Sequence, residues 1–433
     1  MTRLGHLLSK DDLMKTLPVA LVSVCLFLAR AGAEEIARAT PQEMGLAAAK
    51  LDQVKTIVQT MVDKHRAAGA VVLVARRGKI VQIVCVGKMD TATGKPMRPE
   101  AIFRIYSMTK PITSVAALML ADDGKLALDD PVRHYLPEFK GLRVHTGKGD
   151  ETVPAAREMT VRDLLRHTSG LSYGLLGDSA VDRLYRANKI GDREDTLADL
   201  VRKLGKLPLE YQPGKHCSYS FSTDVLARVV EVAGNKPFDE FLQEQIFRPL
   251  DMRDTGFAVP DDKLDRFTAS HRRGKEGLEV GDAPETSLFR KKPKFLSGGG
   301  GDSSGGGGLV STARDYLRFA QMLLNGGELE GKRLLRAETV RAMTTNQLPP
   351  EALPMKVGGT PLMGVGFGLG VGVRLADKPD TAAGEYSWGG AADTAFWIAP
   401  QSELVVIVLQ QVQPATSELQ LALRPVIYAA IEK

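Results

Sequence analysis

The sequence predicts an α+β fold in which strands from both ends of the chain form one antiparallel sheet, with a mainly helical subdomain inserted between them. Strand-like runs lie near the two ends of the 433-residue chain. Apolar residues at helical spacing flank these runs, which predicts a terminal helix at each end. Residues 122–350 consist mostly of helical patterns and polar loops. We expect a ligand site in the cleft between the two parts.

The N-terminal part begins with an amphipathic helix at residues 46–65, where apolar side chains recur every three to four positions. Residues 70–75 and 79–86 are rich in branched apolar residues and predict two strands, which a tight Arg-Gly turn joins as a hairpin. A long apolar helix at 107–121 follows, and the helical patterns of the middle of the chain begin after it.

The C-terminal part returns to strands at residues 364–375, 385–400 and 404–412 and closes with a helix at 419–431. The strands at both ends therefore share one sheet that the terminal helices cover. We expect a single domain at 34–433 with two interleaved parts, an α/β part at about 45–121 and 360–433 and a helical part at about 122–350.

Residues 1–33 predict a signal peptide. Basic residues precede an apolar run at 17–29, and Ala31-Gly32-Ala33 is an A-x-A cleavage site. The apolar run is short for a membrane span, so we expect cleavage after Ala33 and an exported protein, periplasmic or extracellular. An anchored form stays open. No other segment of the sequence predicts an integral membrane span.

The composition excludes several classes of protein. Hydrophobic residues make up 43% and charged residues 25%, as in an ordinary globular domain. The net charge of +5 is dispersed, which argues against a nucleic-acid partner. The histidines do not fall at metal-ligand spacings. Cys25 lies in the signal peptide, and Cys85 and Cys217 are expected to be buried free thiols, although one bridge stays open.

The stretch Ser107-Met108-Thr109-Lys110 opens the long apolar helix. Residues three apart share one face of a helix, so a hydroxyl and an ammonium lie side by side near its N-terminus. The helix dipole favours developing negative charge there. Ser107 is thus a candidate nucleophile, with Lys110 as the group that helps to move its proton. Alone the pattern is common by chance, so further elements are needed.

Tyr219 is the candidate for a third group that relays the proton. It follows a turn at 212–215 and precedes a helix at 224–232, so its side chain could point into the cleft. A tyrosine suits this role if nearby cations lower its pKa towards neutrality. A lone tyrosine in such a place would more often serve packing.

The last element of the site is Trp388-Gly389-Gly390-Ala391. A glycine pair in a strand marks the close approach of a ligand or another backbone. An edge strand here would offer the Ala391 N–H to an oxyanion, alongside the N–H of Ser107.

Two other features are interpreted as structural. The sequence at 170–174 matches G-x-S-x-G around Ser172, but a helical pattern precedes it where a nucleophile elbow needs a strand. His167 stands at the end of that helix, and we expect it to cap carbonyls or order a loop rather than to catalyse.

In their order and spacing these elements resemble the serine β-lactamase and penicillin-binding-protein-like hydrolases, in particular the class C-like branch with its family VIII carboxylesterases. The resemblance spans about residues 45–430, and matching phrases lie at 103–110, 128–132, 164–171, 211–214 and 306–315. It implies a β-lactamase-like fold and acyl transfer through an acyl-serine. Ser107 would be the nucleophile, Lys110 and Tyr219 the proton relay, and the N–H groups of Ser107 and Ala391 the oxyanion hole. It implies no metal and no organic cofactor.

Two departures from the family pattern bear on the substrate. Class C β-lactamases carry Tyr-x-Asn and Lys-Thr-Gly, whereas this chain has Phe221 and Trp388 at the Asn and Lys positions. The missing lysine would meet the carboxylate of a β-lactam. Trp-Gly-Gly is the form seen among family VIII esterases. We therefore expect Phe221, Trp388, Gly389 and Gly390 to form an apolar substrate site that suits neutral esters.

The leading hypothesis is an exported serine carboxylesterase that hydrolyses short- to medium-chain or aryl esters, with weak β-lactamase activity left open. Its partner is a small-molecule ester. The alternatives are a true β-lactamase or D-Ala-D-Ala-type peptidase, and a related acyltransferase. An inactive binding protein that kept the fold is a different class, against which the presence of Ser107, Lys110 and Tyr219 argues. The physiological substrate and the oligomeric state are left open.

Overall fold

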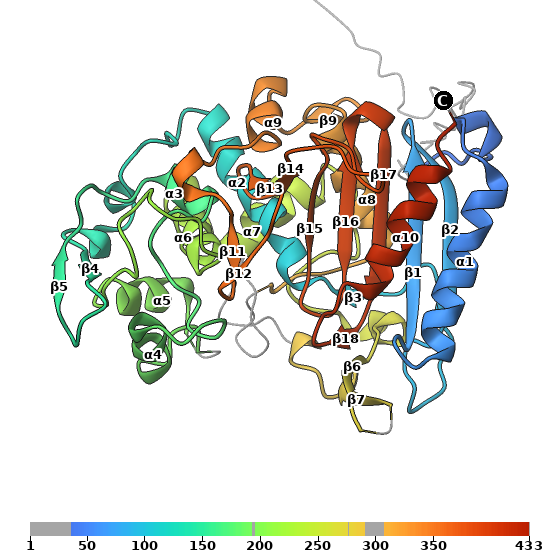
Figure 1. The fold of residues 1–433 in the computed structure, drawn as a ribbon, viewed down its shortest axis with the longest axis horizontal. Coiled ribbons are helices and arrows are strands. Elements are labelled where there is room, and N and C mark those ends of the chain that lie inside the picture. Colours follow the sequence, from blue (N-terminus) through green and yellow to red (C-terminus); the bar gives the residue numbers. More distant parts are fainter. Residues whose placement is uncertain (1–35, 193–194, 276, 291–306, 433) are drawn as a thin grey trace, which may run out of the picture. The chain divides into compact units, whose positions relative to one another are not determined.

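A seven-stranded antiparallel sheet forms the centre of the computed structural model, which describes residues 36–192, 195–275, 277–290 and 307–432 (Figure 1). The strand order is β13-β14-β15-β16-β17-β1-β2. β1 (Gly69–Arg76) pairs with its hairpin partner β2 (Lys79–Gly87) and with β17 (Leu404–Gln410). The two ends of the chain therefore share one sheet, as the sequence predicts. The predicted signal peptide at 1–33 lies outside the described residues.

Two of the predicted C-terminal strands, at 364–375 and 385–400, are each divided into a hairpin, so the prediction of single strands is wrong there. The four strands are β13 (Val365–Phe367), β14 (Gly372–Arg374), β15 (Tyr386–Gly389) and β16 (Ala395–Ala399). Gly370, at φ +100°, and Asp393, at φ +61°, turn the chain in the left-handed conformation. Gly370 also packs so closely on Ser114 that a Cβ would lie 2.0 Å from the serine Oγ.

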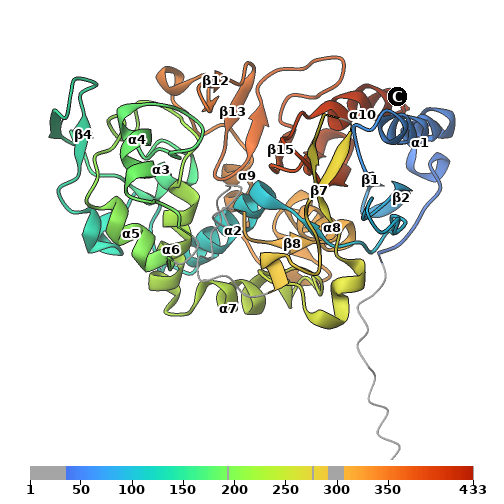
Figure 2. The same ribbon diagram turned by 90° about the horizontal axis from the view of Figure 1, so that it is seen from below.

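Helices cover both faces of the sheet. α1 (Ala48–Asp63) and α10 (Glu418–Ala429) lie side by side on one face (Figures 1 and 2), which confirms the two predicted terminal helices. α8 (Ala313–Leu324) packs against β17. Successive side chains of β1 alternate between two apolar cores: Val72 and Val74 belong to the core under the terminal helices, and Val71 and Leu73 to the larger core on the opposite face.

The middle of the chain is mainly helical, as predicted, and it joins the sheet part where α6 (Ser222–Gly234) packs along α2 (Thr109–Asp122). Besides α6 and α8, the described residues of this part form the α-helices α3 (Val161–Leu165), α4 (Ala180–Ala187), α5 (Leu197–Leu204), α7 (Phe238–Leu242) and α9 (Ala337–Met343).

The remaining strands of the described residues form small sheets, one of three strands and the others of two. They are β3 (Phe103–Arg104) with β8 (Val310–Ser311), β4 (Arg143–His145) with β5 (Thr152–Pro154), β6 (Ser270–Arg273) with β7 (Leu278–Asp282) and β18 (Val412–Gln413), β9 (Glu328–Leu329) with β10 (Lys332–Arg333), and β11 (Lys356–Val357) with β12 (Thr360–Pro361). Cys85 and Cys217 are free thiols, as expected, but only Cys217 is buried: Cys85 is partly exposed, so the expectation of burial is wrong for it. In the part of the chain that the structure describes, no helix combines the length and the apolar composition that crossing a bilayer requires.

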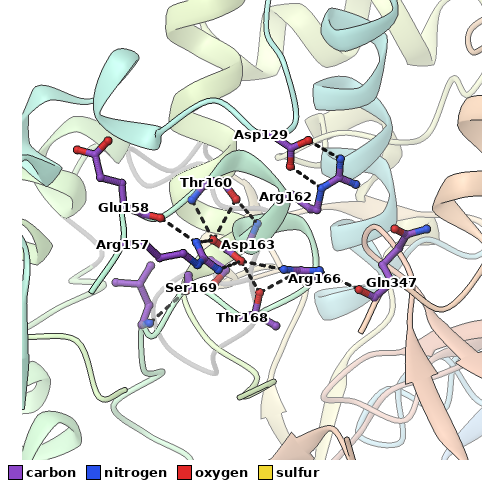
Figure 3. A network of polar contacts seen from close by, with 12 residues as sticks. Asp129, Arg157, Glu158, Thr160, Arg162, Asp163, Arg166, Thr168, Ser169 and Gln347 are labelled. Atoms are coloured by element: carbon purple, nitrogen blue, oxygen red, sulfur yellow. Dashed lines mark hydrogen bonds and ion pairs between the residues drawn. The ribbon is translucent and has the colours of Figure 1, made fainter. Parts of the chain in front are cut away.

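Asp163, in the first turn of α3, is the hub of a polar network (Figure 3), which means that its carboxylate accepts hydrogen bonds from several residues. Its carboxylate, which has no exposed surface, accepts hydrogen bonds from Arg157 at 2.6 and 2.9 Å, from Thr168 at 2.7 Å and from Arg166 at 3.2 Å. Thr160 completes a capping box with it. Burial alone would raise the pKa of Asp163, but the bonds from Arg157, Thr160 and Thr168 outweigh burial and lower it. The network fixes the loop that leaves α3 towards the site.

We predict that Asp163→Ala lowers the free energy of unfolding at pH 7 by about 3 kcal/mol or more, because Arg157 and Arg166 lose their shared carboxylate. The matched control, Asp129→Ala, breaks a largely exposed pair with Arg162 and should cost about 1 kcal/mol or less. Since folding lowers the pKa of Asp163, its contribution is complete above the unfolded-state pKa of about 3.9 and is lost as the pH falls through the lower folded pKa. Urea unfolding measures all three proteins, and equal losses in the two variants would contradict the assigned hub.

Candidate active site

Ser107 lies in a 3₁₀ turn, η2 (Tyr106–Met108), that runs directly into α2. Tyr106 has φ +43°, a left-handed conformation that is costly for a residue with a side chain. Gly307 accommodates this turn, because a Cβ at that position would lie 2.4 Å from the Tyr106 Cα. A residue with a side chain at position 307 would therefore clash with the Tyr106 backbone, next to Ser107.

Lys110 is fully buried one helical turn after Ser107, and its Nζ lies 3.4 Å from the Ser107 Oγ. The same Nζ stands 4.5 Å from the centroid of the Tyr219 ring and 5.7 Å from that of Tyr173. Burial lowers the pKa of Lys110 to about 7, and the nearby Asp224 carboxylate opposes this only in part. Near neutral pH a large fraction of Lys110 is therefore an uncharged amine that can accept the Ser107 proton.

Tyr219 lies against this pair with 8% of its surface exposed. Its hydroxyl accepts a hydrogen bond from the Trp388 indole at 3.4 Å, and its ring stacks on Tyr173 at 5.5 Å with 8° between the planes. Burial raises the pKa of Tyr219, and hydrogen bonds with Ser107 and Trp388 compensate only in part. The condition that cations lower this pKa is therefore not met. A raised pKa favours the protonated phenol at neutral pH, and the roles of Tyr219 and Lys110 in proton transfer stay predictions.

The Trp388-Gly389-Gly390 segment reaches the same place from the sheet, since β15 packs against η2. A Cβ on Gly390 would lie 2.5 Å from the Ile105 carbonyl oxygen, so the backbone approach inferred from the glycine pair is present. The prediction of an edge strand is wrong: β15 lies between β14 and β16. Its pairing with β14 is nevertheless limited to Tyr386 and Ser387. The role of Ala391, the residue after Gly390, as an oxyanion donor stays a prediction.

Phe221 does not reach the surface of the site. Its side chain is 1% exposed and stacks on Tyr173 at 4.8 Å with 15° between the planes. The structure shows only its packing against Tyr173, so the expected contact between Phe221 and substrate stays a prediction. The sequence could not show this packing, because the direction of the side chain depends on how the first turn of α6 packs.

A cavity of about 730 Å³ adjoins Tyr219. Tyr173 and Leu176 contribute apolar wall, and residues 351–359 close the other side. Ser172 of the G-x-S-x-G match also lines it, but this serine follows the helix α3 and hydrogen-bonds to Asp182. That environment agrees with its structural interpretation.

Two buried groups near the relay were not singled out as site residues from the sequence. Asp224 lies in the first turn of α6, has no exposed surface, and raises the pKa of Lys110 against the effect of burial. His167, expected to order a loop, places its ring 4.9 Å from the ring of Tyr219. For Asp224, the sequence signal that could have indicated a site residue is its place five residues after Tyr219, in the first turn of a helix.

The chain is similar to known proteins over most of its length. The profile of the family described as Beta-lactamase matches residues 54–429. Protein Rv1367c of Mycobacterium tuberculosis is 35% identical over 381 residues, which cover 85% of this chain and 91% of that protein. Esterase EstB of Burkholderia gladioli is 32% identical over 402 residues, covering 88% and 95%.

Among solved structures, EstCE1, described as a hydrolase with promiscuous acyltransferase activity, superimposes with a TM-score of 0.72 at 27% identity. The match covers 88% of this chain and 99% of that one. The predicted β-lactamase-like fold is therefore confirmed.

We predict that the rate at which a fluorophosphonate labels Ser107 rises with pH and levels off above about 7, the pKa to which burial lowers Lys110. Below that pKa Lys110 is an ammonium and cannot accept the proton. Lys110→Met should slow labelling by about 100-fold or more above pH 7, and the difference from the wild type should shrink as the pH falls and Lys110 becomes protonated. A rate that rises only above about pH 9, where an ordinary lysine begins to lose its proton, would contradict the assignment.

Proposed function

Since the chain belongs to the beta-lactamase family, we propose that it is a serine carboxylesterase that hydrolyses short- to medium-chain or aryl esters. The observation that carries the proposal is the set of contacts at Tyr219. The phenol is hydrogen-bonded to the indole of Trp388 and lies beside the Ser107–Lys110 pair. The sequence identity of 32% with Esterase EstB, over 88% of the chain, supports ester hydrolysis in particular.

In the proposed reaction the Ser107 Oγ attacks the ester carbonyl carbon while its proton passes to the Lys110 Nζ, 3.4 Å away. The N–H groups of Ser107 and Ala391 would stabilise the oxyanion of the tetrahedral intermediate. As the intermediate collapses, the alcohol leaves with a proton from the Tyr219 hydroxyl, and Lys110 returns its proton to Tyr219. Water then attacks the acyl-serine by the reverse route, which releases the acid and restores Ser107.

The charges around the cavity favour neutral esters over anionic β-lactams. Trp388 stands where the family's lysine would meet a substrate carboxylate, and its indole N–H is already engaged by Tyr219. Four carboxyl side chains line the cavity against one lysine: Asp178, Asp182, Glu210, Glu351 and Lys356. Burial and the Asp182 carboxylate raise the pKa of Glu210, because both disfavour its charged form. Asp178 is paired with Arg183 and Arg186, but the other three carboxyl groups still outnumber the lysine, so an anionic substrate would meet net negative charge there.

Acyl transfer to an alcohol other than water is the second candidate. The cavity of about 730 Å³ beside Tyr219 is large enough to hold an acceptor alcohol as well as a leaving group. The description of EstCE1 as a hydrolase with promiscuous acyltransferase activity also supports acyl transfer as the second candidate. Product analysis with a small alcohol present separates the two reactions, because transfer yields a new ester.

We predict that Ser107→Ala abolishes hydrolysis of p-nitrophenyl butyrate and labelling by a fluorophosphonate, with residual activity lower by about 10⁴-fold or more. The matched variant is Ser172→Ala, which removes the serine of the G-x-S-x-G match and should stay labelled. Peptide mapping locates the label. A label on Ser172, or full esterase activity in Ser107→Ala, would refute the proposed nucleophile.

We also predict that kcat/KM for p-nitrophenyl butyrate exceeds that for a chromogenic cephalosporin by about 100-fold or more, because the cephalosporin carboxylate lacks a cation and meets the acidic cavity wall. A D-Ala-D-Ala peptide, which is also anionic, should be a poor substrate for the same reason. The three constants are measured side by side at pH 7. A higher value for the cephalosporin or the peptide would favour the β-lactamase or the peptidase.

A further inference from the structure

We propose that His167 is a positioning residue that holds the Tyr219 phenol against Ser107 and Lys110. The inference rests on the proposed function, in which Tyr219 relays the proton. It goes beyond the loop-ordering role expected for His167, because the histidine contacts the relay tyrosine and both residues beside it.

His167 brackets Tyr219 through three separate contacts. Its carbonyl accepts a hydrogen bond from the Ser218 N–H at 3.0 Å, and its ring Nδ1 lies 3.3 Å from the Ser220 Oγ. Its ring packs on the Tyr219 ring with 4.9 Å between the centroids and 47° between the planes. The residues before, at and after the relay position are therefore all held by one side chain and its own carbonyl.

The backbone of His167 is itself fixed in an unfavourable conformation. Its φ of +56° is left-handed, which persists in a residue with a side chain only where the surroundings enforce it. The next residue, Thr168, is tied to the buried Asp163 carboxylate at 2.7 Å and accepts the Gly214 N–H at 2.7 Å. The Asp163 hub thus sets where the His167 ring can lie.

The ring orientation is fixed by a chain of buried hydroxyl groups. From the His167 Nδ1 the chain runs to the Ser220 Oγ, then to the Ser222 Oγ at 2.8 Å and the Ser169 Oγ at 2.7 Å. It ends at the Leu171 N–H, which donates to Ser169 at 3.1 Å. All three serines are fully buried, so a rotated ring would leave a polar group without its partner.

His167 holds Tyr219 without bringing a second positive charge to the relay. Its side chain is 1% exposed, and burial, with Lys110 nearby, lowers the pKa of His167 well below its ordinary value. The ring is therefore neutral at the working pH. Lys110 from α2 is the charged group that acts on His167, and Asp224 from α6 acts on Lys110 in turn. The Phe367 ring packs on the His167 ring with 5.4 Å between the centroids. Because His167 is buried and near enough to Lys110 for their charges to interact, we expect its ring to fill space beside the amine.

The test compares three variants with the wild type. His167→Asn removes the ring while keeping a residue that tolerates positive φ, so the backbone carbonyl can stay in place. Ser220→Ala keeps the ring and removes its hydrogen-bond partner. His271→Asn is the matched control, because His271 is equally buried but binds Thr91 and Gln411 instead of Tyr219.

For His167→Asn we expect kcat for p-nitrophenyl butyrate to fall by about tenfold or more with KM within about threefold, since transition-state geometry is lost and ground-state binding is kept. The pH at which fluorophosphonate labelling levels off should move upward, because water that reaches Lys110 weakens the effect of burial on its pKa. Ser220→Ala should show the same pattern to a smaller extent, and it serves as the test if His167→Asn does not fold. His271→Asn should keep kcat and the pH profile.

Either of two results would overturn the inference: labelling of His167→Asn or Ser220→Ala at the wild-type rate with an unshifted pH profile, or an equal fall in kcat for His271→Asn at equal folded fraction. In both cases a wild type labelled at Ser107 leaves the proposed function standing. A wild type that is not labelled at Ser107 overturns both proposals.

Discussion

The enclosure of the Lys110 amine is the constraint on which the rest of the site depends. An ammonium without exposed surface is costly, and the protein responds by binding its proton less tightly. The amine that results stands one helical turn from Ser107. The enclosure is built by the packing of α2 against α6 and by the aromatic rings of Tyr173 and Tyr219. The Asp224 carboxylate opposes the effect of burial in part, and the pKa of Lys110 is about 7.

The same burial divides the work between the two proton-carrying groups. It lowers the pKa of a cationic acid, Lys110, and raises that of a neutral acid, Tyr219, so in the proposed mechanism one acts as the base and the other as the hydrogen-bond donor at the same pH. Trp388 fits this division, because its indole donates to the Tyr219 oxygen without adding a charge. A lysine at that position would bring a second cation beside Lys110. The exchange of lysine for tryptophan thus bears on proton transfer as well as on substrate choice.

The predictable part of the fold is the part that local patterns determine. The terminal helices and the β1–β2 hairpin follow from apolar periodicity, and the Ser107–Lys110 pair follows from residue spacing on a helix. The division of 364–375 and 385–400 into hairpins could not be predicted from local patterns, because the turns depend on close packing, as between Gly370 and Ser114. The buried position of Phe221 and the raised pKa of Tyr219 could not be predicted for a related reason. Both follow from burial by residues that are distant in sequence, and Tyr173, which stacks on both rings, is one of them.

The central claim is that burial lowers the pKa of Lys110 to about 7, so that a large fraction of it is an uncharged amine near neutral pH. The most direct test is an NMR titration of protein carrying ¹³C at the lysine Cε atoms. The structure predicts one lysine signal that titrates with a midpoint near the pKa of about 7 and is missing from the spectrum of Lys110→Met. If every lysine signal instead titrates near the ordinary value of about 10.4, Lys110 is a permanent cation and the account of how Ser107 is activated is wrong.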